Sequence, residues 1–218
     1  MVKQPKPETL AERTRRAVSN ELVDAAQALF AEKGYEQVTI DEIAEATGIS
    51  RRSFFRYFAS KDELVLGRFD QQGEQYVDAL NARPLDEPLW VALRRMADVT
   101  IAYVSDPELG RRASEMDRLI HSSESLRAGF LRRMEIAQGL VTDAARQRES
   151  VRGSDLSDIA IAATVAAAFS AIMVAGEQAR AHGTSWARVF DEAMTALTPA
   201  HADTQHQPAQ VETRSNGG

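Results

Sequence analysis

The sequence predicts an all-α protein, and three observations support that prediction. Apolar residues recur at spacings of three and four along most of the chain, which is the period of a helix with one buried face. No stretch of the sequence alternates apolar and polar residues in the β-branched, turn-bounded manner of strands. With 44% hydrophobic and 27% charged residues, the 218-residue chain can bury a substantial core. We expect about nine helices.

The first two expected helices lie before residue 49. The first runs from about residue 10 to 33, with apolar residues on one face and Gly34 as its C-terminal stop. The second begins after Thr39, because Thr39 and Glu42 have the spacing of a capping box, and it ends at Gly48.

The third and fourth expected helices each follow a serine, a residue type that caps helix N-termini. The third is short, starts after Ser50 and carries three Phe residues between positions 54 and 58. The fourth starts with a second capping box at residues 60–63 and runs to about Asn81, before Pro84. Five further helices are expected at about 87–105, 106–121, 124–148, 155–181 and 184–197.

The formal net charge of −6 is carried entirely by the residues after position 60. Residues 1–60 have nine basic and nine acidic side chains, whereas the remainder has 17 basic and 23 acidic ones. A local cluster of cations dominates the field within a Debye length of about 8–10 Å. The overall acidity therefore does not exclude a nucleic-acid partner.

Cysteine usage and the N-terminal residues indicate a cytoplasmic protein. The chain has no Cys, which excludes disulfides, thiolate nucleophiles and Cys-based zinc sites. The first 16 residues are polar and basic, unlike a secretory signal. Residues 159–176 carry no charge, but they are rich in Ala, so we expect a buried core helix or a subunit contact here and no membrane span.

A helix-turn-helix pattern is predicted between residues 39 and 58. Ala44 provides a small residue where two helices cross, Gly48 permits a tight turn, and Phe54 anchors the second helix. The opposite face of the second helix exposes Arg51, Arg52, Ser53 and Arg56. Arginine donates to phosphates and to O6 and N7 of guanine. Taken alone, these arginines are equally compatible with an ordinary solvated face.

Three motifs follow one another within residues 13–63. The first, F-x-x-x-G-Y, spans residues 30–35, and the second, T-x-x-x-I-A-x-x-A-G-hydrophobic-S, spans residues 39–50 with Thr47 at a position where Ala is usual. The third is a T-L-Y-x-H/Y-F pattern followed by x-S-K, here at residues 53–61. With these motifs the segment resembles the DNA-binding domain of the TetR family of transcriptional regulators.

The resemblance implies a ligand-responsive, sequence-specific regulator, a repressor that a small apolar or amphipathic effector releases from a palindromic DNA operator. It implies that Thr39 meets phosphate, that the Arg and Ser side chains of the second helix face the major groove, and that Tyr57 and Lys61 hold the DNA backbone. Phe55 stands where many members have Tyr. The implied DNA-contacting residues are Thr39, Arg51, Arg52, Ser53, Phe55, Arg56, Tyr57 and Lys61.

The resemblance also implies a division of the chain and a homodimer. We expect a flexible arm at 1–9, the DNA-binding domain at 10–60, a ligand-binding and dimerisation domain at 61–198, and a disordered polar tail at 199–218. The last two helices would form the dimer contact. An apolar stripe on the last one belongs either to that contact or to the core of one subunit: Trp186, Phe190, Met194 and Leu197.

Methionines and aromatic residues of the second half suit an adaptable effector pocket, although each fits ordinary core packing as well. The candidates are Trp90, Met96, Tyr103, Met116, Ile120, Phe130, Met134, Phe169 and Met173. Polar residues among them are candidates for orienting a ligand or binding a cation: Glu115, Asp117, His121 and Glu135.

The sequence contains no H-E-x-x-H motif, no Gly-rich phosphate loop and no G-x-S-x-G elbow. We therefore expect no catalytic activity, no cofactor and no metal site. The alternative to a regulator is a non-enzymatic helical protein-interaction module without sequence-specific DNA binding.

Overall fold

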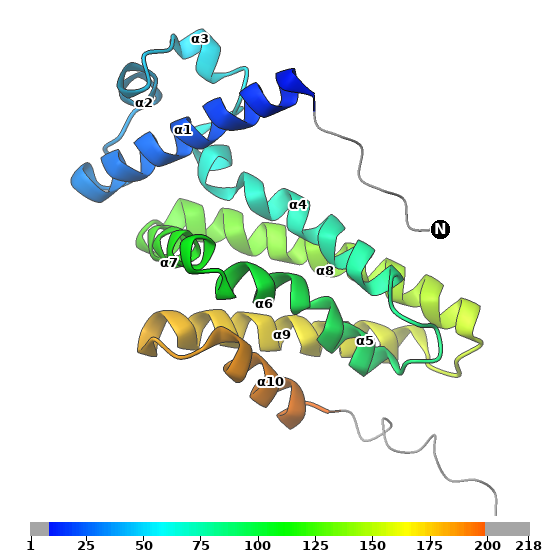
Figure 1. Cartoon of the computed structure of the whole chain (residues 1–218). Helices are drawn as coiled ribbons and strands as arrows, with labels where there is room; N and C mark the ends of the chain where they lie inside the picture. The colour runs from blue at the N-terminus through cyan, green and yellow to red at the C-terminus, as the bar shows by residue number, and fades with distance from the viewer. Residues whose placement is uncertain (1–8, 199–218) are drawn as a thin grey trace, which may run out of the picture. The chain divides into compact units, whose positions relative to one another are not determined.

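A computed structural model describes residues 9–198, which form ten α-helices and no strand (Figure 1). The all-α prediction is confirmed. The arm expected at 1–9, apart from Thr9, and the tail expected at 199–218 lie outside the described residues. The helices are α1 Leu10–Lys33, α2 Ile40–Ala46, α3 Arg51–Phe54, α4 Lys61–Asn81, α5 Leu89–Met96, α6 Asp98–Ser105, α7 Pro107–Ser122, α8 Glu124–Arg152, α9 Asp158–His182 and α10 Trp186–Ala196.

Two elements differ from the sequence-based prediction. The helix expected at 87–105 is split into α5 and α6 at Ala97, which is fully buried and whose N–H donates to the carbonyl of Arg95. The recognition helix α3 has only four residues, because the N–H groups of Arg56 and Tyr57 donate to carbonyls three residues back, those of Ser53 and Phe54, and the chain continues as a turn.

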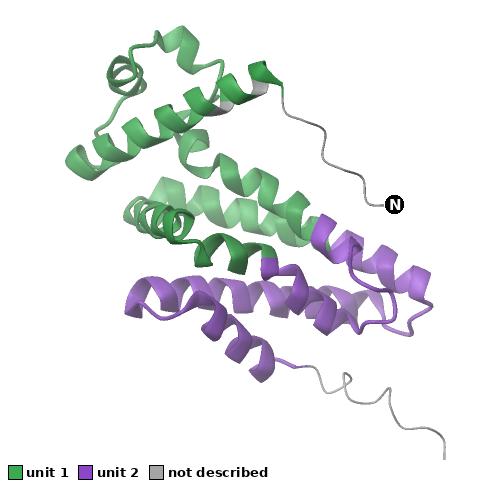
Figure 2. Cartoon of the chain, in the orientation of Figure 1, with its two compact units in different colours: residues 1–77, 99–141 green, residues 78–98, 142–218 purple. Residues whose placement is uncertain are grey.

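The chain forms two compact units (Figure 2). Unit 1 comprises the described residues up to Val77 together with Val99–Val141, and unit 2 comprises Asp78–Asp98 with the described residues from Thr142 onward. Unit 1 thus holds α1 to α3, most of α4, α6, α7 and the first part of α8. Unit 2 holds α5, α9, α10 and the last turns of α4 and α8.

Glycines allow α4 and α8 to approach closely within unit 1. A Cβ on Gly73 would lie 3.2 Å from the Cα of Ala137, and a Cβ on Gly129 would lie 2.7 Å from Cδ1 of Leu66. By contrast, nothing lies within 4 Å of the corresponding position at Gly139. The first two glycines therefore permit helix packing, whereas the third leaves open space beside α8.

In unit 2 the apolar helix α9 packs against α5 and α10. Length and composition alone would let α9 cross a membrane, since its most apolar stretch has a mean hydropathy of 2.2. Seven of its residues, including Phe169 and Ile172, are nevertheless buried in the described chain. This is the packing expected of a core helix.

The apolar stripe on α10 is largely intrasubunit core. Phe190 is fully buried and Met194 is 3% exposed, while Trp186 stacks on Phe190 with a ring-centroid separation of 5.0 Å. Of the two alternatives for this stripe, Phe190 and Met194 therefore belong to the core of one subunit, because their surface is already covered within the chain. Leu197 remains exposed.

Candidate DNA-binding site

The predicted helix-turn-helix is present in unit 1. Gly48 has a φ of 67°, the left-handed conformation that the tight turn requires and that glycine adopts without steric cost. The first helix of the pair, α2, buries Ile43 and Ala44, and α3 buries Phe54 completely. These anchors fix α3 so that its opposite face points to solvent.

A capping box starts α2. The Thr39 hydroxyl accepts the N–H of Glu42 at 3.2 Å, and the Glu42 carboxylate accepts the N–H of Thr39 at 2.8 Å. Glu42 also pairs with Lys33 at 2.8 Å. The hydrogen bonds from Lys33 and from the Thr39 backbone lower the pKa of Glu42 to about 2. Thr39 is predicted to meet phosphate, and its N–H already has a carboxylate partner in the free protein.

Thr47, the departure from the family motif, serves the end of the same helix. Its hydroxyl donates to the carbonyls of Ile43 and Ala44, at 3.0 and 3.2 Å. The side chain returns to its own helix, so this substitution leaves the turn intact.

The exposed arginines of the recognition helix are not equivalent. Arg51 pairs with Asp41 of α2, with Nη1 2.9 Å from Oδ2, and its guanidinium lies 5.8 Å from the Phe55 ring centroid. Arg52 and Arg56 are exposed, and neither has an ion-pair partner within the described residues. These two arginines can therefore meet an external anion without first losing an internal partner.

Arg56 lies after α3, in the turn, and shares a surface hollow with the start of α1. The residues lining this hollow are Leu10, Ala11, Thr14, Arg15, Arg56 and Tyr57. It brings Tyr57, a predicted contact to the DNA backbone, together with Arg15 of α1 and Arg56 of the turn after α3. Arg15 belongs to the basic run of α1, so the cationic surface includes α1 as well as α3.

Lys61 begins α4 and faces the turn between α1 and α2. Its ammonium donates to the carbonyls of Tyr35 and Val38, at 2.7 and 2.9 Å, and lies 4.2 Å from the Tyr35 ring centroid. The Tyr35 hydroxyl donates to the carboxylate of Asp62, also on α4. Sequence reasoning missed this role, in which Lys61 joins α4 to the DNA-binding helices.

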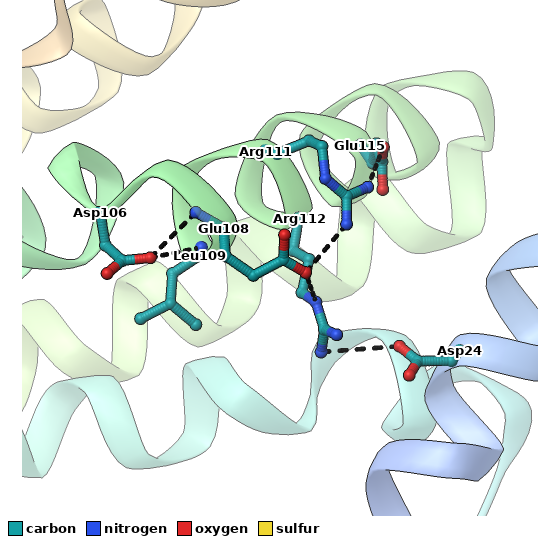
Figure 3. Close-up of polar contacts among 7 residues, drawn as sticks. All are labelled: Asp24, Asp106, Glu108, Leu109, Arg111, Arg112 and Glu115. Carbon is teal, nitrogen blue, oxygen red and sulfur yellow. Dashed lines mark hydrogen bonds and ion pairs between the residues drawn. The ribbon is translucent and has the colours of Figure 1, made fainter.

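A second connection joins α7 to α1 (Figure 3). Arg112 lies between two carboxylates, 3.0 Å from Glu108 of its own helix and 3.6 Å from Asp24 of α1. At the other end of α7, the Ser123 hydroxyl donates to Glu36 at 2.6 Å, in the turn that follows α1. Both ends of α7 therefore contact the DNA-binding part of unit 1.

The nine candidate effector residues divide between the two units. Unit 1 contains Tyr103, Met116, Ile120, Phe130 and Met134, and unit 2 contains Trp90, Met96, Phe169 and Met173. Tyr103, Phe130 and Met173 are partly exposed, and the other six are buried. Their burial is equally expected of core residues, so the pocket assignment stays a prediction.

A polar cluster that the sequence analysis missed lies within unit 1. The Gln72 amide donates to the Tyr76 hydroxyl at 2.8 Å and to the Thr100 hydroxyl at 3.2 Å, and the two hydroxyls are 2.7 Å apart. Burial raises the pKa of Tyr76 to about 12. The sequence signal that could have indicated this cluster is the four-residue spacing of Gln72 and Tyr76, which places both side chains on one face of the helix.

Three of the polar residues considered as cation ligands, Glu115, Asp117 and His121, have partners on α7, whereas Glu135 has none within the described residues. Glu115 accepts from Arg111 at 2.7 Å (Figure 3), and Nδ1 of His121 lies 2.8 Å from the carbonyl of Asp117. Glu135 is exposed on α8. Within residues 9–198, no group of three or more His, Asp or Glu side chains is placed to hold a metal ion.

A packed helix-turn-helix with solvent-facing arginines defines a DNA-binding protein of the helix-turn-helix class. Residues 22–67 match the family model described as "Bacterial regulatory proteins, tetR family". The HTH-type transcriptional regulator TcmR of Streptomyces glaucescens is 34% identical over 167 residues, which cover 75% of this chain and 73% of TcmR. The chain belongs to the TetR family of transcriptional regulators.

Solved structures share the fold at low sequence identity. A SmeT–triclosan complex matches with a TM-score of 0.60 at 16% identity, covering 83% of this chain and 91% of that one. FadR of Thermus thermophilus, solved with lauroyl-CoA, matches with a TM-score of 0.53 at 18% identity, covering 92% and 100%. At these identities the likeness establishes the fold alone.

Proposed function

We propose that the chain is a homodimeric repressor that binds a palindromic operator in the cytoplasm and leaves it when a small apolar or amphipathic molecule binds. Residues 10–60 form the DNA-binding domain, and residues 61–198 bind the effector and the second subunit. The observation that carries the proposal is the set of exposed cations Arg15, Arg52 and Arg56 around a rigidly anchored recognition helix.

In the proposed complex, the recognition helix enters the major groove. Arg52, Ser53 and Arg56 face the bases, and Arg51 joins them once DNA replaces Asp41 as its partner. Tyr57 and Thr39 lie along the DNA backbone with Phe55 beside them. The Lys61 ammonium uses two of its three N–H groups in hydrogen bonds to carbonyls, so one N–H remains to donate to a phosphate.

The exposed face of α9 is the proposed dimer surface. Its residues follow one helical stripe and carry no charge over four turns: Ile159, Ala163, Ala166, Ser170 and Val174. Ile159 is 82% exposed and Val174 is 43% exposed. Small residues between them allow a second helix to approach closely, and a two-fold dimer matches a palindromic operator.

The effector proposal draws on the apolar interior and on two relatives. SmeT was solved with triclosan and FadR with lauroyl-CoA, one molecule apolar and the other amphipathic. The buried methionines Met116 and Met134 of unit 1 supply adaptable packing, and the Gln72 cluster of the same unit supplies polar partners for a carbonyl or hydroxyl. Coupling to DNA would pass through the contacts of α4 and α7 with α1 and its turn.

Binding to DNA tests the proposal. The purified protein is titrated with the duplex upstream of its own gene and with a shuffled duplex, at several salt concentrations. Sequence-dependent binding at two subunits per site, lost when triclosan or lauroyl-CoA is added as a probe, would support the whole proposal. Equal, weak binding to this duplex, to the shuffled one and to a genomic fragment pool would instead favour a protein-interaction module.

A further inference from the structure

The outer face of α8 in unit 1 is exposed and combines apolar with charged side chains. Its residues at helical spacing are Ala128, Leu131, Arg132, Glu135, Ile136 and Gly139, and the first five of them line an open surface hollow. Leu131 is 46% exposed and Ile136 is 55% exposed. Large aliphatic side chains exposed together on one helix are typical of an interaction surface.

Among the residues that the structure describes, this face is not covered by other parts of the chain. The opposite face of α8 buries Met134 and Ala137. Arg133 pairs with Asp70 at 2.8 Å, whereas neither Arg132 nor Glu135 has an ion-pair or hydrogen-bond partner within residues 9–198. Two opposite charges are thus left beside the exposed aliphatic residues.

The residue types on this face are complementary to themselves. They are symmetric about a point midway between residues 133 and 134. Reversing the helix about this point places Arg132 at the position of Glu135, and Leu131 at the position of Ile136. The small Ala128 and Gly139 exchange in the same way. If a second copy packs antiparallel about a two-fold axis at this point, Arg132 is level with the partner subunit's Glu135. Each such pair then occurs twice, as in any isologous contact.

We propose that the outer face of α8, residues 128–139, binds the same face of a second copy of this chain as an antiparallel helix pair. The open space beside Gly139 and the small side chain of Ala128 let the two helix axes approach. The two charged pairs fix the register and exclude the parallel orientation, in which Arg132 would meet its own copy.

The contact is separate from the proposed dimer surface on α9, so it joins dimers to one another. One helix pair of about three turns is a small interface, and it is correspondingly weak in dilute solution. Two dimers bound to neighbouring sites on one DNA molecule hold their α8 faces at a high effective concentration. The surface would therefore favour cooperative occupation of adjacent operators.

Cysteine cross-linking tests the register, because the natural chain contains no Cys. Positions 128 and 139 lie about 16 Å apart along one helix, too far for a disulfide within a chain. In the proposed pair, each is level with the other position of the partner subunit. We expect the double variant Ala128→Cys/Gly139→Cys to form covalent dimers on oxidation, as seen by non-reducing electrophoresis. The single variants, the matched controls, should not.

Absence of the covalent species in the double variant would overturn the proposal. So would single variants that cross-link as readily as the double variant, since random collision would then explain both. The result is also independent of the α9 dimer: if that dimer does not exist, the double variant still forms covalent pairs, but no larger assembly accompanies them.

Charge reversal gives a second measurement, by sedimentation over rising protein concentration. The natural chain should associate beyond the dimer, Arg132→Glu and Glu135→Arg should each abolish this step, and the double exchange should restore it. Arg118→Glu, an equal charge change at an exposed site on α7, should behave like the natural chain. Single reversals that associate as strongly as the natural chain, or a natural chain that never associates further than the single reversals, would contradict the proposal.

Discussion

At the scale of single residues, the four basic side chains predicted to contact DNA fall into two groups. Arg52 and Arg56 are exposed and unpaired within the described residues, whereas Arg51 and Lys61 already have partners in the free protein. Residue type alone does not distinguish these groups. The difference predicts that substitutions of chemically similar residues will have distinct consequences.

Arg56→Ala should weaken binding to the specific duplex by about 1–3 kcal/mol if the guanidinium contacts a base, with less effect on the shuffled duplex. The measurement is a pair of titrations at one salt concentration. Arg118→Ala, an exposed arginine on α7, is the control and should leave both affinities unchanged. Equal losses of affinity on both duplexes would show that Arg56 contacts a phosphate and not a base.

Lys61→Ala should lower the free energy of unfolding by about 1–3 kcal/mol, because two carbonyls of the α1–α2 turn lose their charged donor. Urea unfolding measures this loss. The salt dependence of DNA binding tests whether the remaining N–H group of Lys61 donates to a phosphate. If it does, the slope of the logarithm of the binding constant against the logarithm of the salt concentration should fall in magnitude by about one in the variant. An unchanged stability would show that the turn does not depend on Lys61.

At the scale of elements, short-range chemistry sets where the helices begin and end. The capping box of Thr39 and Glu42, the Ser50 cap and the left-handed glycines Gly34 and Gly48 lie where the sequence predicts them. Each device acts between residues fewer than five apart, so the sequence alone contains its physical cause. The break at Ala97 has no such signal, since neither Gly nor Pro occurs between residues 89 and 105.

The α2 capping box should weaken in acid. The pKa of Glu42 is lowered from 4.5 to about 2 in the folded protein, chiefly by the hydrogen bond from Lys33. Its contribution to stability is therefore complete above pH 4.5 and is lost as the pH falls toward 2. The stability difference between the natural chain and Glu42→Gln, measured by unfolding across this range, should shrink on acidification. A difference independent of pH would contradict the assignment.

Two glycines in helices of unit 1 should respond oppositely to alanine. Gly139→Ala should stabilise the protein by about 0.5–1 kcal/mol, because alanine favours the helix and its Cβ meets open space. Gly73→Ala should gain nothing or lose stability, because its Cβ would lie 3.2 Å from the backbone of Ala137. Thermal unfolding of the two variants checks the contrast, and equal shifts would refute the packing argument.

At the scale of the whole molecule, the fold class and the DNA-binding segment were predictable, while several side-chain partners were not. The helical period and the caps identify the elements, and the motifs identify the first third of the chain. The burial of Phe190, the carbonyl partners of Lys61 and the cluster around Tyr76 depend on residues more than 20 positions away or on other helices. Periodicity shows that a residue faces inward or outward, but not which surface covers it.

Ala163→Glu should separate the proposed α9 dimer while leaving the subunit folded. In the proposed dimer, the substitution would bring the two new carboxylates, one from each subunit, into the contact without cationic partners. Sedimentation should show loss of the dimer, circular dichroism should show unchanged helicity, and DNA affinity should fall. Ser150→Glu, an exposed position on α8, is the matched control. A dimer that survives the substitution would place the subunit contact on another surface.

The ion pair between Asp41 and Arg51 bears on how the protein searches a genome. An arginine already neutralised by a carboxylate displaces fewer counterions when it approaches an arbitrary phosphate, so it adds little to sequence-independent binding. At the operator, a base that accepts two hydrogen bonds from the guanidinium can replace the exposed carboxylate. If Arg51 contacts a base as proposed, Asp41 would thus shorten the time that the regulator spends on the many incorrect sites that compete for it.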